Sequence, residues 1–259
     1  MKKFFILSLF ILATLKLSAA TGDLDSLKQK LQLITNDSLK APVYTEIAGC
    51  YLKYDTIVNI RKKRMYQNEA LNYTMMALHL YSRYSDTTGL RVSFDNLAKV
   101  YHSQKKFSQA KWFILQSNSL SRIKNDTLNI ITSLIKLSNI KMDIKEYKMA
   151  MRDLNEALSM SVATRTPKME AIVQQNYGYL YNRMGDPKKG DIALKRADLI
   201  NDSIKRDEEA KLAAIQMPGD SIVVKKVVVP VVKIKKKVIV SVGRKPSKKQ
   251  LAKKEVASL

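Results

Sequence analysis

The sequence predicts an all-α protein, folded as a right-handed α-solenoid of about four helix-turn-helix repeats with a period of about 40 residues. Two observations support this prediction. The chain of 259 residues is 46% hydrophobic but has only eight glycines and six prolines, a balance that favours helices over short strands joined by turns. Small residues also recur at one constant step, at Ala70, Ala110, Ala150 and Gly190.

Residues 1–20 predict a secretory signal peptide of bacterial type. Lysines at positions 2 and 3 precede an apolar run over 4–15, and small residues at 18–20 mark a cleavage site. A retained membrane anchor is the alternative, but the run is shorter than the roughly 20 residues that a spanning helix needs. We therefore expect an exported protein, periplasmic or secreted, that is cleaved after Ala20.

The rest of the chain divides into four predicted segments. These are a leading amphipathic helix at 21–35, the repeats at 36–200, a polar capping helix at 201–217, and a basic tail at 218–259. The tail begins where Pro218-Gly219 ends the preceding helix.

Recurring polar residues predict where the repeats begin. Asp86-Thr87 and Asp126-Thr127 are separated by the same step as the small residues, and the Asn-Asp-Ser triplets at 36–38 and 201–203 have the same character. Side chains of these types accept hydrogen bonds from the free N–H groups at a helix start. We therefore expect a helix to begin at each of these places.

The repeat register resembles the tetratricopeptide repeat. That family places a large residue, a small one and an aromatic on the first helix, followed by small, bulky and small residues on the second. Two features differ: the family period is about 34 residues, and Lys141 stands where an aromatic is expected. Helical repeats with periods of about 40 to 47 remain the alternative. The matching residues are Leu97, Ala98, Tyr101, Ala110, Ile114 and Ser117; then Leu137, Ser138, Lys141, Ala150, Leu154 and Ala157; then Tyr177, Gly178, Tyr181, Gly190, Leu194 and Ala197.

The resemblance implies a non-catalytic scaffold or adaptor that binds a protein or peptide partner. In that family the first helices line a concave groove that holds a peptide segment or helix. A sensory-ectodomain-like signalling module is a further alternative. The positions that correspond to the family's groove are Asp95, Lys99, His102, Asn139, Met142, Gln175, Tyr179, Asn182 and Arg183.

The tail offers a second hypothesis, an envelope-surface tether. Residues 218–259 hold twelve Lys or Arg and two acidic residues, a net charge of +10, which predicts a disordered or extended segment. It is either a solvated tail or a ligand for anionic glycolipid, phospholipid or cell-wall polymer. Nucleic acid is disfavoured, because the tail lacks aromatic residues to stack on bases. The candidate cations are Lys225, Lys226, Lys233, Lys235, Lys236, Lys237, Arg244, Lys245, Lys248 and Lys249.

No pattern predicts catalysis, a cofactor or a metal. His79 and His102 are the only histidines, they fall in different repeats, and neither has metal-ligand spacing. The glycine-containing stretch at 185–190 is interpreted as a turn between helices rather than a phosphate loop. We therefore expect that the protein is not an enzyme.

Overall fold

The computed structural model describes residues 23–216, and every element in that range is helical. The predicted signal peptide and the basic tail, with its ten candidate cations, lie outside the described residues. Residues 23–33 form a first helix, which corresponds to the predicted leading helix. The elements that follow are α2 (Asp37–Tyr51), η1 (Tyr54–Thr56), α3 (Ile60–Arg83), α4 (Thr87–Ser103), α5 (Phe107–Ile123), α6 (Thr127–Asp143), α7 (Tyr147–Ala163), α8 (Pro167–Arg183) and α9 (Pro187–Gln216).

One type of turn ends the helices from α3 to α8, and it explains the constant period. Each turn contains one residue with positive φ. In the α4–α5 turn, Lys105 has φ 59°, its N–H bonds to the carbonyl of His102, and the N–H of Lys106 bonds to that of Tyr101. This is the Schellman pattern of helix ends. Two helices of 17 residues each, with the short turns that follow them, make one repeat. The positive-φ residues are Ser85, Lys105, Asn125, Lys145, Arg165 and Gly185.

The predicted helix starts are confirmed at three of four places. The side chain of Asn36 accepts a hydrogen bond from the N–H of Ser38, Asp86 accepts from Thr88 and Gly89, and Asp126 accepts from Asn129. The prediction at 201–203 is wrong, since these residues lie inside α9. No glycine or proline interrupts α9 there, and polar residues are tolerated on an exposed helix face. The last repeat helix and the predicted capping helix are therefore one continuous helix.

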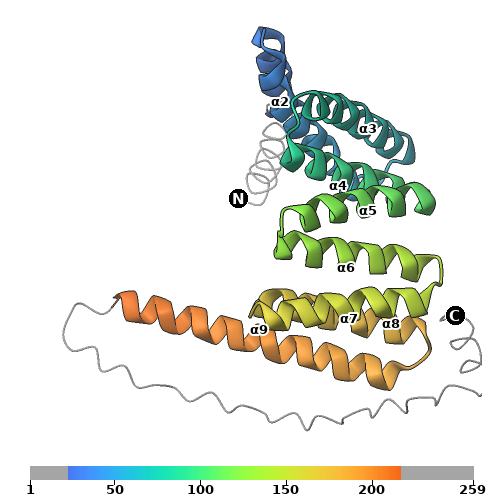
Figure 1. Ribbon diagram of the computed structural model, residues 1–259, viewed down its shortest axis with the longest axis vertical. Coiled ribbons are helices and arrows are strands. Elements are labelled where there is room, and N and C mark those ends of the chain that lie inside the picture. The colour runs from blue at the N-terminus through green and yellow to red at the C-terminus, as the bar shows by residue number, and fades with distance from the viewer. Residues whose placement is uncertain (1–22, 217–259) are drawn as a thin grey trace, which may run out of the picture. The chain divides into compact units, whose positions relative to one another are not determined.

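Successive helices pack against one another in chain order, which makes the fold an α-solenoid. Figure 1 shows α4, α5, α6 and α7 lying one after another. First helices also contact each other across repeats, as α6 contacts α8. Helices α8 and α9 approach each other closely, because a Cβ on Gly178 would overlap the side chain of Leu194. Small residues at the repeat positions therefore mark helix contacts, as expected.

One hairpin carries an ion pair where its neighbours carry aromatic or small residues. Lys141 on α6 and Asp153 on α7 are buried, and their Nζ and Oδ1 atoms are 2.8 Å apart. In the preceding hairpin the same positions hold Tyr101 and Phe113, whose stacked rings have centroids 5.4 Å apart. Lys141 thus replaces the expected aromatic residue together with a second change, the acidic residue Asp153 on the facing helix.

Among residues 23–216, no helix is long and apolar enough to cross a membrane.

Candidate functional site

The candidate site lies on the surface formed by α2, α4, α6 and α8, which we call the first-helix face. A pocket of about 250 Å³ opens on this face between α4 and α6. Four of the residues predicted for the groove line it together: Asp95, Lys99, His102 and Asn139. Its apolar lining comes from Ala98, Ile114 and Ile140.

Asp95 connects two repeats at the edge of this pocket. Its Oδ2 atom is 3.2 Å from Arg91 Nη1 on the same helix and 3.0 Å from Lys136 Nζ on α6. The second carboxylate oxygen, Oδ1, is buried and accepts no hydrogen bond from the described residues. A buried acceptor without a donor is costly, and because neighbouring atoms cover this oxygen, a ligand does not reach it in this conformation.

Lys99 links the pocket to the preceding repeat. Its ammonium group donates to the carbonyl of Leu52 at 3.1 Å and lies 3.6 Å from Asp55 Oδ2. It also lies over the ring of Tyr54, 5.6 Å from the centroid. The Lys99 side chain is half exposed, so its charge is available to a ligand at the pocket.

A chain of hydrogen-bonded charged side chains connects three successive repeats through α4, α6 and α8. His102 Nε2 on α4 is 2.6 Å from Asp143 Oδ2, and Arg183 Nη1 on α8 is 2.5 Å from Asp143 Oδ1. Because an ionised carboxylate only accepts hydrogen bonds, both side chains act as donors here. Burial raises the pKa of Asp143, but the hydrogen bonds from Arg183 and His102 lower it by more, so this pKa lies below its ordinary value.

The low pKa of Asp143 predicts how the stability of the fold depends on pH. Because the folded pKa is below the unfolded one, the carboxylate stabilises the fold above about pH 3.9, and this contribution is lost as pH falls through the folded value. We expect Asp143→Asn to lower the free energy of unfolding at pH 7 and to matter progressively less below about pH 4. Urea unfolding of both proteins across this range checks the prediction, and a cost that grows on acidification would contradict it.

The remaining predicted groove residues separate into three groups. Gln175, Tyr179 and Arg183 lie on α8 at steps of four positions, so they share one side of that helix. Asn182 is directed toward α9, because its Oδ1 occupies the space that a Cβ on Gly190 would fill. Met142 does not lie on the surface. The prediction for Met142 is wrong, because it is 3% exposed and packs in the core with Ala150 and Leu154.

The structure adds three residues that sequence reasoning missed: Asn96, Lys136 and Asp143. Asn96 and Lys136 occupy the same position in successive repeats, and both line the pocket. Asp143 shares its repeat position with Arg183, which was predicted for the groove, so the register already contained the signal for Asp143. The resemblance predicts which helices line the candidate groove, whereas the side-chain pairs between repeats are specific to this chain.

Comparison with known proteins finds likeness at the level of structure. No family model matches the chain. No curated protein matches it either. Among solved structures, the chain is similar to BtubC (BKLC) from P. vanneervenii, with a TM-score of 0.58 and 15% sequence identity over 80% of each chain. At this identity the likeness supports the fold alone.

Proposed function

We propose that the chain is a non-catalytic scaffold of the tetratricopeptide type, which binds a peptide segment of a partner protein on its first-helix face. The observation that carries the proposal is the pocket between α4 and α6, where Asp95, Lys99, His102 and Asn139 converge over an apolar floor. An apolar floor with a few polar groups at its edge suits one amphipathic side chain of a ligand.

The polar groups at the pocket suit an extended backbone. Lys99 donates to a peptide carbonyl, and the Asn139 amide either donates to a carbonyl or accepts from a peptide N–H. Tyr179 is 54% exposed on α8 and offers a large apolar contact farther along the same face.

The test blocks the pocket without removing packing. Asn139→Arg places a long side chain at the pocket opening, and Asn139 makes no side-chain hydrogen bond among the described residues that would be lost. The control is Asn72→Arg, the same substitution at an exposed position of α3.

Peptides are selected on the wild-type chain from a random display library, and their affinities are measured for all three proteins. We expect Asn139→Arg to weaken binding at least about tenfold, roughly 1.4 kcal/mol, while Asn72→Arg leaves it unchanged. A selection that enriches no peptide, or peptides that bind both variants equally well, would contradict the proposal.

A further inference from the structure

A second charged surface lies at the start of α3, and it shares no residue with the pocket between α4 and α6. Arg61, Lys62, Lys63 and Arg64 are consecutive, and Lys105 and Lys106 in the α4–α5 turn lie beside them. We call these six residues the basic patch. The two segments are joined by a hydrogen bond of 2.9 Å from Gln67 Nε2 to Ser103 Oγ.

The cations of the basic patch form no ion pair within the described residues. The sequence explains why. No acidic residue occurs from 56 to 68, and none occurs from 96 to 125. Elsewhere, by contrast, cations pair across repeats, as Arg122 does with Glu156. Unpaired like charges that are held together create a positive potential that attracts anions.

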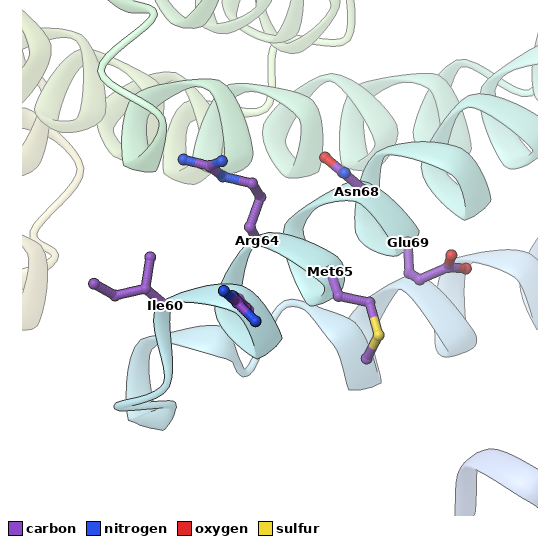
Figure 2. A pocket seen from close by; sticks show the side chains of 6 residues that line it. Ile60, Arg64, Met65, Asn68 and Glu69 are labelled. Carbon is purple, nitrogen blue, oxygen red and sulfur yellow. The ribbon is translucent and has the colours of Figure 1, made fainter.

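The basic patch surrounds hollows of the surface rather than a flat area. Lys63, Arg64, Lys105 and Lys106 line a pocket of about 470 Å³ together with uncharged polar side chains. A neighbouring pocket of about 410 Å³ is lined by Arg61, Arg64 and one acid, Glu69. Figure 2 shows Arg64 and Asn68 projecting from one side of α3, and Met65 and Glu69 from another.

Aliphatic side chains stand exposed next to these charges. Val58 is 95% exposed, Ile60 is 75% exposed and Met65 is 51% exposed. Val58 and Ile60 flank Asn59, the residue that caps α3, so they project at the very start of the helix. Exposed apolar side chains beside unpaired lysines and arginines are the combination with which proteins bind at the interface of an anionic bilayer.

We propose that the basic patch, with Val58 and Ile60, docks the chain on an anionic phospholipid membrane. The cations contact headgroup phosphates, and the two aliphatic side chains enter the boundary between headgroups and acyl chains. A nucleic acid would also supply phosphates, but single-stranded binders stack bases on exposed aromatic rings. Here the exposed side chains are aliphatic, which favours lipid. This docking site shares no residue with the peptide pocket or with residues 218–259.

The test uses the full chain, so that the tail is present in every variant. A tryptophan reporter is introduced as Val58→Trp in a Trp112→Phe background, because Trp112 is the only tryptophan. Phosphatidylcholine vesicles with and without phosphatidylglycerol are added. We expect the emission to shift to shorter wavelength only with phosphatidylglycerol, because residue 58 enters the bilayer interface.

Two charge variants of equal net charge separate the patch from general attraction. Arg61→Glu/Arg64→Glu reverses two cations of the patch, and Lys188→Glu/Lys195→Glu reverses two exposed cations on α9. We expect the patch variant to bind vesicles at least about tenfold more weakly than the α9 variant, since one cation near an anionic surface contributes about fivefold. Position 61 lies in the first turn of α3 and position 64 directly after it, where glutamates suit the helix dipole, so folding is retained, and circular dichroism checks this.

A third variant, Val58→Ser/Ile60→Ser, keeps every charge and removes the apolar contact. We expect weaker vesicle binding that is lost more readily on adding salt. An unshifted emission of the reporter while the chain still sediments with vesicles would overturn the proposal and assign attachment to the tail. Binding to single-stranded RNA that requires Arg61 and Arg64, without vesicle binding, would overturn it as well.

Discussion

Replacing Lys141 with methionine is expected to lower the free energy of unfolding by about 3–5 kcal/mol at pH 7. The side chains of Lys141 and Asp153 are only 6% and 9% exposed, and the ammonium lies 2.6 Å from Asp153 Oδ2. Methionine keeps the shape of the lysine but leaves the carboxylate buried without its cation. The cost of an uncompensated buried charge exceeds that of most single substitutions.

The effect of Lys141→Met depends on pH with a definite sign. Burial raises the pKa of Asp153 above its ordinary value, although Lys141 acts in the opposite direction. Removing Lys141 therefore raises this pKa further. As pH falls, Asp153 binds a proton and its charge disappears, so the cost of the substitution is largest at neutral pH and shrinks on acidification. Urea unfolding at neutral and acidic pH measures this difference.

The other repeats suggest a double substitution that should restore the stability lost in the single variants. In the last hairpin the same two positions hold Tyr181 and Ala193. The double variant Lys141→Tyr/Asp153→Ala therefore exchanges the ion pair for a pair that this fold already accommodates, with total side-chain volume nearly unchanged. Replacing a buried ion pair with well-packed side chains of similar volume is often neutral or stabilising. We expect the double variant to unfold close to the wild-type midpoint, whereas each single variant unfolds earlier.

The double-mutant cycle gives the coupling between the two side chains. A coupling near zero, with each single substitution costing less than about 1 kcal/mol, would show that the pair is solvated and would contradict the burial argument.

The sequence was sufficient to predict the stacked hairpins, because the signals that fix them are local. Asp86 and Asp126 cap helices with their own side chains, and Ala110 and Ala150 permit close contact wherever the register places them. The end of the stack was harder to predict. The polar residues at 201–203 resemble a cap, but a cap requires the preceding turn, and no residue there leaves the helical conformation.

Part of the candidate site was predictable, for a reason that also explains the errors. Equivalent positions of successive repeats share a helix face, which is why Asp95, Lys99 and Asn139 come together at one pocket. The repeat register does not determine how deeply the residue at a given position is buried in each repeat. Helix α6 lies between hairpins on both sides, so Met142 is buried there, whereas Asn182, at the same position in the last hairpin, is exposed.

The repeats also differ in how deeply one core position is buried, and this determines the expected loss of stability when that residue is replaced by alanine. Ile114, Leu154 and Leu194 occupy the same place on successive second helices. The first two are 2% and 0% exposed, while Leu194 is half-buried at the end of the stack. We expect Leu154→Ala and Ile114→Ala each to lower the free energy of unfolding by about 2–5 kcal/mol, because both leave a cavity. Leu194→Ala is expected to cost less, because water already reaches its surroundings.

The same series separates stability from binding, since only one of the three side chains lines the pocket. Ile114 forms part of its floor, whereas Leu154 packs in the core between α6, α7 and α8. At a temperature where all variants are folded, Ile114→Ala should weaken the selected peptides while Leu154→Ala leaves their affinity unchanged. Calorimetric titration beside urea unfolding measures both quantities on one sample. Equal loss of peptide affinity in the two variants would mean that binding follows global stability. That result would contradict the proposal that the pocket binds the peptide.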